Sequence, residues 1–225
     1  AALQLREMWS YRDLFLTFGL RDVKLRYRQT ALGVSWVLLQ PLIAAAIFAF
    51  VFGRVADLPS DGHPYFVFAF AGLMGWNAFN TTLTRTSTSL LANSQLVSKV
   101  YFPRLILPAS TLMATAIDFL ITSCVMAGML AVTSTPLTLH LLLLPIWLAL
   151  LLMIATGMGL VLGGTSVRFR DVAILTPVAA QMLLYISPVA YPVSSVPARY
   201  RDLYELNPLT GLLEGFRWSL LGNGH

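Results

Sequence analysis

The side chains that could carry out chemistry in this 225-residue chain are few and lie far apart. Asp118 stands alone in a long uncharged run, and ionisable residues in hydrocarbon usually face protein or a water-filled path. Asp118 could therefore belong to a proton or ion relay. Alternatively, it could be a structural, hydrogen-bonded residue that lines a pathway. Because no second carboxylate and no Lys, Arg or His accompanies Asp118 within an apolar run, the sequence favours the structural role.

Motifs for nucleotide hydrolysis and metal binding are missing from the sequence. Residues 163–166 (GGTS) lack the lysine that would hold phosphate in a nucleotide-binding loop. His63, His140 and His225 are scattered, and no His/Cys cluster has the spacing of a metal site. We therefore predict that the chain is not an enzyme and binds no cofactor or metal. If ATP drives it, another chain must hydrolyse the ATP.

Two aromatic and two amide side chains stand close together in one apolar run. They are Trp76, Asn77, Phe79 and Asn80. Such a surface could hold a sugar ring, because an aromatic face covers its C–H groups while amides bond its hydroxyls. Aromatic belts at the two membrane interfaces explain many of the chain's other aromatic residues. These four residues and Asp118 are our candidates for residues that line a transport pathway.

The composition is that of a membrane protein. Hydrophobic residues make up 57% of the chain and charged residues 11%, whereas a soluble domain carries about 25% charge. The predicted spans are apolar runs, uncharged except for Asp118, that reach the ~20 residues that a bilayer requires. These are residues 33–52, 64–84, 105–132, 139–162 and 172–190, in one all-α domain of residues 1–225. Residues 191–221 mix charges with aromatics and are predicted to form short helices in or dipping into the outer interface.

Lysine and arginine are distributed unevenly between the two sides that these spans define. Eleven basic residues fall before the first span and after the second and fourth, and four fall on the other side. Cytoplasmic loops carry this excess, so the N-terminus is predicted to be cytoplasmic. The asymmetry explains the net charge of +5 without nucleic-acid binding.

Two stretches on the predicted cytoplasmic side could act on a partner. Residues 10–30 predict an amphipathic interface helix with Arg21, Lys24 and Arg28 on its basic face. Its apolar face would carry Leu16, Leu20, Val23 and Tyr27. That helix would be a membrane-surface anchor or a platform that also contacts a partner. Residues 90–104 are apolar for a loop, and they predict either a short helix docked in a groove of another protein or a loop packed on its own bundle.

Three stretches, in order, resemble the ABC-type (type 2) exporter permeases of polysaccharides, O-antigens and polyol-phosphate polymers. They are RDVKLRYRQTALGVSWVLLQPL at 21–42, LVSKVYFPRLILP at 96–108, and VRFRDVAILTPVAAQMLLYISPVAYPVSSVP at 167–197. Asn207-Pro208 and residues 215–217 (GFR) follow in the same order. Together these elements cover nearly the whole chain.

The resemblance implies a polytopic permease of the bacterial cytoplasmic (inner) membrane that exports a lipid-linked, O-antigen-like polysaccharide. It implies a homodimer with two ATPase subunits that bind ATP and Mg, and a sixth span beyond the five visible here. It also implies a coupling helix that docks in the ATPase. The residues carried over for that helix are Asn93, Ser94, Leu96, Val97, Lys99, Val100, Tyr101 and Phe102.

Two other classes of membrane protein are alternatives to an exporter permease. An ion- or proton-coupled carrier would use Asp118, but it would need further intramembrane charges and paired interrupted helices. A membrane-embedded glycosyl- or acyltransferase would need polar catalytic residues at a membrane face, and none is evident in the sequence.

Overall fold

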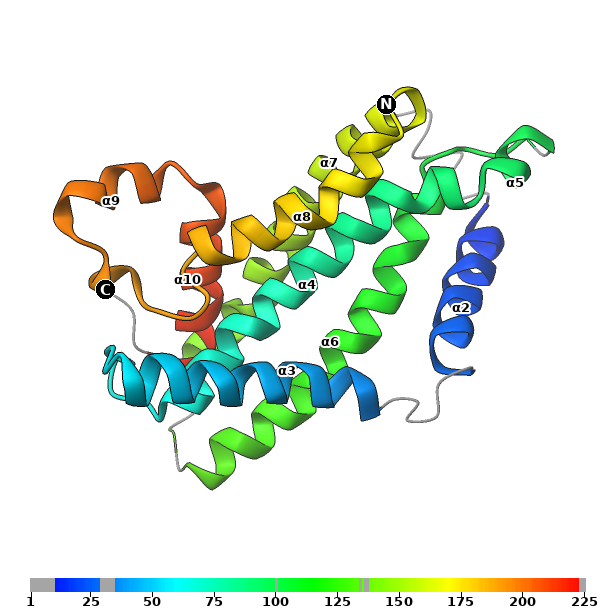
Figure 1. Cartoon of the computed structure of the whole chain (residues 1–225). Helices are drawn as coiled ribbons and strands as arrows, with labels where there is room; N and C mark the ends of the chain where they lie inside the picture. The colour runs from blue at the N-terminus through cyan, green and yellow to red at the C-terminus, as the bar shows by residue number, and fades with distance from the viewer. Residues whose placement is uncertain (1–10, 29–34, 100, 134, 136–137, 223–225) are drawn as a thin grey trace.

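The computed structural model of the chain describes residues 11–28, 35–99, 101–133, 135 and 138–222. These residues form an all-α bundle, with no strand among them (Figure 1). In chain order the helices are α2 (Arg12–Arg28), α3 (Ser35–Phe48) with its π-helical continuation η1 (Ala49–Val55), α4 (Tyr65–Ala92), α5 (Ser94–Lys99), α6 (Ile106–Val132), the 3-10 helix η2 (Leu139–Leu143), α7 (Leu144–Arg168), α8 (Asp171–Ile186), the 3-10 turn η3 (Val193–Ser195), α9 (Ala198–Glu205) and α10 (Pro208–Leu221).

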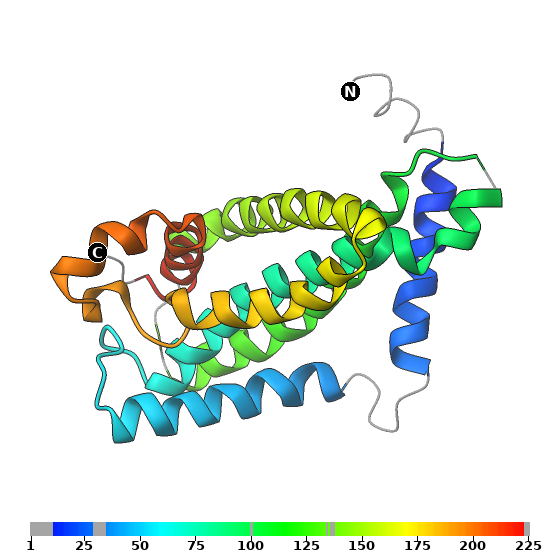
Figure 2. The same cartoon turned by 45° about the horizontal axis from the view of Figure 1, so that its top comes forward.

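The long helices run between two ends of the bundle (Figure 2). One end carries α2, α5 and the turn between α7 and α8. The opposite end carries α9, α10 and the loop between η1 and α4. The segments that the charge asymmetry assigns to the cytoplasmic side therefore gather at one end of the fold.

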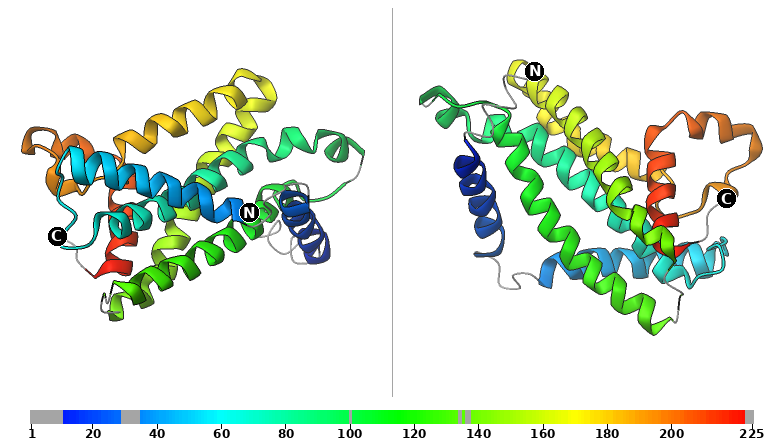
Figure 3. Two further views of the ribbon diagram at one scale, coloured as in Figure 1. Left: turned by 60° about the horizontal axis from the view of Figure 1, so that its bottom comes forward. Right: turned by 180° about the vertical axis from the view of Figure 1, so that it is seen from behind.

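Helix α4 is the centre of the bundle, with α3, α6, α7, α8 and α10 packed around it (Figure 3). Most of its residues are buried, including Phe68, Phe70 and Phe79. Its hydroxyl groups are also inside: Ser87 Oγ donates to the carbonyl of Thr84 at 2.8 Å. A helix surrounded by protein can carry these polar groups because they bond within the helix and need not face lipid.

A line of small residues brings α7 against α4. Ala155, Gly159 and Gly163 recur every four residues on one face of α7, and all three are buried. A Cβ atom on Gly159 would lie 2.7 Å from Thr86 Cβ, and one on Gly163 would lie 3.0 Å from the carbonyl oxygen of Ser87. Small residues at this spacing let two membrane helices approach closely and gain van der Waals contact. The four-residue spacing of these small residues can be read directly from the sequence.

Three described helices are long and apolar enough to cross a membrane: Ser35–Val55, Ile106–Val132 and Leu139–Arg168. They coincide with the first, third and fourth predicted spans. Helix α4 is long enough at 28 residues but is too polar to join that group. Helix α8 has 16 residues, which rise about 24 Å against a hydrocarbon core of about 30 Å. The count of five spans stays a prediction.

The helices differ from the predicted spans at several ends. Helix α4 continues past Arg85 to Ala92, because a charged residue ends an apolar run without ending a helix. Helix α7 continues beyond the predicted end at Leu162, through the small residues 163–166, to Arg168. Helix α8 stops at Ile186, four residues before the predicted end of its span. Pro188 accounts for this stop, since the residue before a proline is disfavoured in helical conformation and Ser187 is extended.

Replacement of Gly159 by alanine should destabilise the fold by about 1–3 kcal/mol, the usual cost of overpacking. The new methyl group would press on Thr86 and on the backbone oxygen of Leu83. Gly157→Ala on the same helix is the matched control, because nothing lies within 4 Å of its Cβ position. Thermal unfolding midpoints of the two purified variants in detergent would measure the difference, and equal midpoints would contradict the close contact of α7 with α4.

Candidate functional site

An apolar cluster fastens α2 to the end of the bundle. Its buried members are Phe18 on α2, Phe102 before α6, and Ile106 and Leu107 on α6. The rings of Phe18 and Phe102 lie 6.0 Å apart between centroids. The segment that follows α5 is thereby packed on α2 and α6.

The packed face of α2 differs from the apolar face that the sequence suggested. Leu16 and Leu20 on that suggested face are 47% and 49% exposed. Phe18 and Gly19 face the bundle instead, and a Cβ on Gly19 would lie 2.6 Å from the Met113 side chain on α6. Helix α2 therefore has a second apolar face, which includes Phe18 and was not predicted from the sequence.

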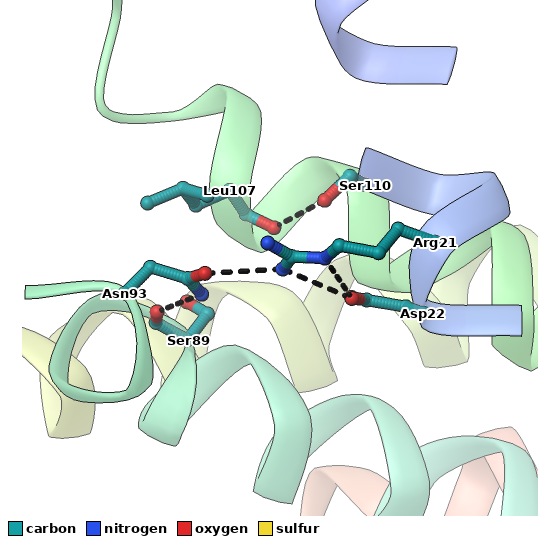
Figure 4. Close-up of polar contacts among 6 residues, drawn as sticks. All are labelled: Arg21, Asp22, Ser89, Asn93, Leu107 and Ser110. Atoms are coloured by element: carbon teal, nitrogen blue, oxygen red, sulfur yellow. Dashed lines mark hydrogen bonds and ion pairs between the residues drawn. The ribbon is translucent and has the colours of Figure 1, made fainter. Parts of the chain in front are cut away.

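Polar contacts tie α2 to the junction between α4 and α5 (Figure 4). Arg21 Nη2 donates to Asn93 Oδ1 at 3.0 Å, and Arg21 also bonds Asp22 Oδ1 through Nε and Nη2 at 3.3 and 3.2 Å. Asn93 Nδ2 in turn donates to the carbonyl oxygen of Ser89 at 2.9 Å. Arg21 and Asn93, 72 positions apart in sequence, therefore meet at this end. Lys24 is exposed, and the side chain of Arg28 lies outside the described part of the chain.

The side chains of the predicted coupling residues differ in their exposure to solvent. Tyr101 is 87% exposed, whereas Phe102 is 6% exposed within the cluster on α2. Phe102 thus holds its own segment in place, where the sequence had predicted a direct contact with a partner. Ser94 and Lys99 on α5 are exposed. The residue Val100 and the side chains of Leu96 and Val97 lie outside the description.

The predicted aromatic–amide surface is not an open surface in this chain. Trp76 and Phe79 pack against each other with centroids 5.5 Å apart and are 3% and 0% exposed. Asn77 and Asn80 are half-buried. Both rings lie on faces of α4 that neighbouring helices cover. The assignment of these four residues to a transport pathway stays a prediction.

Asp118 lies within α6 and is half-buried. The hydroxyl of Thr122, one turn further on, donates to its backbone carbonyl at 3.1 Å. Among the described residues, no group of three or more His, Cys, Asp and Glu side chains could hold a metal ion.

A buried arginine organises the opposite end of the bundle. Arg217 on α10 is 5% exposed; its Nη1 donates to the carbonyl oxygen of Pro188 at 2.9 Å, and its Cζ lies 4.1 Å from the ring centroid of Phe68. Burial lowers the pKa of Arg217, and the carboxylate of Glu214, 3.8 Å away, opposes that shift. Glu214 Oε1 also accepts from the backbone N–H of Val193 at 3.2 Å.

Asn207 adds a second connection between the same segments. Its Oδ1 accepts from the N–H of Leu209 at 3.1 Å and caps α10, while its Nδ2 donates to Ser187 Oγ at 3.1 Å. With Arg217 it joins α10 to the loop after α8. An arginine among apolar residues is the sequence signal that could have revealed the buried role of Arg217.

Several similar proteins match nearly the whole chain in sequence. The O-antigen export system permease protein RfbA of Klebsiella pneumoniae is 28% identical over 213 residues, which cover 94% of this chain and 81% of the relative. A protein of the same name from Myxococcus xanthus is 26% identical, with 94% and 82% covered. The polysialic acid transport protein KpsM of Escherichia coli is 27% identical, with 90% and 79% covered.

The family described as ABC-2 type transporter matches residues 13–221, from the start of α2 to the end of α10. That range includes the apolar cluster at one end and the arginine-centred contacts at the other. With its long apolar helices, the chain is a multi-pass membrane protein. It belongs to the ABC-2 type transporter family.

Proposed function

We propose that the chain is the membrane subunit of an ATP-driven exporter that moves a lipid-linked polysaccharide across the bacterial cytoplasmic membrane. The observation that carries this proposal is the family match over residues 13–221. The names of the relatives, which refer to O-antigen export and polysialic acid transport, support a polysaccharide as the cargo.

The end of the bundle that carries α2 and α5 would face the cytoplasm and bind the ATPase subunits. The excess of Lys and Arg on the segments gathered there supports this orientation. Tyr101 is the exposed anchor for the contact, and Phe102 and Asn93 hold the segment on α2. ATP and Mg would bind the partner ATPase, and two copies of this chain would form the path for the polymer.

Reconstitution tests the proposal as a whole. The chain is purified with its partner ATPase and placed in proteoliposomes, where ATP hydrolysis is measured with and without lipid-linked polysaccharide. Stimulation of hydrolysis by O-antigen-type or capsule-type lipid-linked glycans supports the assignment and separates the two cargo classes. No stimulation by any lipid-linked glycan, with the complex intact, would contradict it.

Tyr101→Ala should reduce recovery of the ATPase with the purified chain about tenfold or more, because tyrosines are frequent anchors of interface binding energy. Tyr200→Ala is the control, because Tyr200 is also exposed but lies on α9 at the opposite end. Equal ATPase recovery from the two variants would exclude Tyr101 as an anchor.

The Phe102→Ala variant tests whether Phe102 positions its own segment by packing on α2 or contacts the ATPase directly. Truncation of a buried phenylalanine costs about 3–5 kcal/mol, so this variant should lower the thermal unfolding midpoint, which Tyr101→Ala should leave unchanged. A Phe102→Ala variant with an unchanged midpoint would contradict the packing of Phe102 on Phe18.

Asp118→Asn should retain ATP-driven transport, because the amide keeps the shape and hydrogen-bonding capacity of a structural side chain. The alternative function, an ion- or proton-coupled carrier, requires Asp118 to ionise. Transport into proteoliposomes, with a proton gradient or with ATP, distinguishes the two. Complete loss of transport in a stably folded Asp118→Asn variant would favour the carrier.

A further inference from the structure

A cavity of about 890 Å³ lies at the end of the bundle opposite α2 and α5. Its walls come from α9, α10, the turn η3 before α9 and the loop between η1 and α4, all at the end opposite the proposed ATPase contact (Figure 1). Binding pockets for small molecules typically measure about 300–1,000 Å³. The cavity is therefore large enough for a short segment of a polymer, and none of the pathway candidates named from the sequence lines it.

Helix α10 gives the cavity an aromatic wall that is held in place. Trp218 lines the cavity, and its ring packs on His140 of η2 with centroids 4.2 Å apart. A ring fixed in this way loses little conformational freedom when a ligand packs beside it. The apolar C–H groups of a sugar can cover an aromatic ring while its hydroxyls point away from the ring. The wall therefore favours a ligand that has an apolar face and a polar edge.

Charged side chains from α9 and α10 line the same cavity. Arg201 and Glu205 lie one turn apart on α9, and both are exposed. Glu214 of α10 accepts from the backbone N–H of Val193 through Oε1 at 3.2 Å, and its side chain remains 38% exposed. A guanidinium group only donates hydrogen bonds and a carboxylate only accepts them, whereas a hydroxyl does both. The cavity therefore offers charge-assisted hydrogen bonds of both kinds to the hydroxyls of a ligand.

The charge of the cavity distinguishes between kinds of sugar. Its carboxylates are those of Asp61, Glu205 and Glu214. Its guanidinium groups are those of Arg201 and Arg217. Three negative groups against two positive groups leave one net negative charge, and Arg217 is buried with its Nη1 already bonded to the protein backbone. Like charges across a binding surface suppress the wrong partner, so a sugar that carries a carboxylate or a phosphate is disfavoured here.

We propose that this cavity binds a neutral oligosaccharide segment of the exported polymer at the outer face of the membrane. The Trp218 ring packs against one sugar ring, and Arg201 donates to sugar hydroxyls. Glu205 and Glu214 accept from other hydroxyls of the same segment. The inference rests on the proposed function, which brings a polysaccharide to this end of the bundle, and it narrows the cargo to a glycan without acidic groups. Polysialic acid, the cargo in the name of one relative, is acidic and would not fit.

The test is a calorimetric titration of the purified full chain with neutral tetrasaccharides of mannose, galactose and N-acetylglucosamine, and with tetrasialic acid. A detergent without a sugar headgroup keeps competing sugar out of the cavity. At least one neutral tetrasaccharide should bind about tenfold more tightly than tetrasialic acid, which corresponds to about 1.4 kcal/mol. Absence of binding by every neutral tetrasaccharide, or tighter binding of tetrasialic acid, would overturn the proposal.

Two substitutions at exposed positions of α9 locate the site. Arg201→Ala and Glu205→Ala should each weaken binding of the neutral tetrasaccharide about tenfold, because each removes a hydrogen bond to a charged group. Arg199→Ala and Asp202→Ala are the matched controls, because Arg199 and Asp202 are also exposed on α9 but do not line the cavity. All four variants should keep the thermal unfolding midpoint of the original chain. Equal weakening by a variant and its control would contradict binding in this cavity.

Glu205→Lys tests the role of charge. The substitution turns the net charge of the cavity from negative to positive, so tetrasialic acid should bind this variant about tenfold more tightly than the original chain. Unchanged affinity for tetrasialic acid would contradict selection by charge. None of these titrations needs ATP or the ATPase. If lipid-linked glycans stimulate ATP hydrolysis in the reconstituted complex while no neutral tetrasaccharide binds, only this inference is overturned and the proposed function stands.

Discussion

The close contact of α7 with α4 is the constraint on which the rest of the fold depends. Gly159 and Gly163 remove the side chains that would otherwise separate the two backbones. Lipid chains are as apolar as the helix surfaces, so burial of apolar area supplies little drive for membrane helices to associate, and close packing supplies it instead. With α4 held against α7, the other helices around α4 can enclose it on its remaining faces.

A fully enclosed α4 explains why this helix is both the most polar long helix and the most buried. The hydroxyls of Ser87 and Ser89 donate to carbonyls one turn earlier, and those of Thr82 and Thr86 bond threonine hydroxyls of α6, so enclosure leaves few unsatisfied polar groups. The same enclosure removes Trp76 and Phe79 from any open surface. A path for a polymer along this chain must therefore use other faces, or a conformation in which α4 is less covered.

Both ends of the bundle are fastened by contacts between segments that are distant in sequence. At one end Phe18 meets Phe102 and Arg21 meets Asn93, which places the exposed Tyr101 on a supported segment. At the other end Arg217 donates to Pro188 and holds the loop after α8 on α10. Support at the α2 end is a mechanical requirement for the proposed coupling, because a loosely held segment could not transmit movement from a bound ATPase.

The class of the protein, the position of its long apolar helices and the resemblance to exporter permeases can all be predicted from the sequence. These follow from local quantities: run length, hydropathy and the order of short motifs. The sequence also located α2, because helical periodicity is local. Helix ends were less predictable, since the charge of Arg85 interrupts an apolar run but not the helix that contains it.

The tertiary structure decided which side chains are free to act. Tyr101 and Phe102 are adjacent aromatic residues, and only the packing of Phe102 on Phe18 makes one a support and leaves the other exposed. The two apolar lines of α2 were equally acceptable by periodicity, and the fit of Gly19 against Met113 selected one of them. Arg21 reaches Asn93 at the end of α4 only because α2 folds back onto α6. Exposure and proximity depend on contacts between distant segments, which the spacing of residues along one helix does not encode.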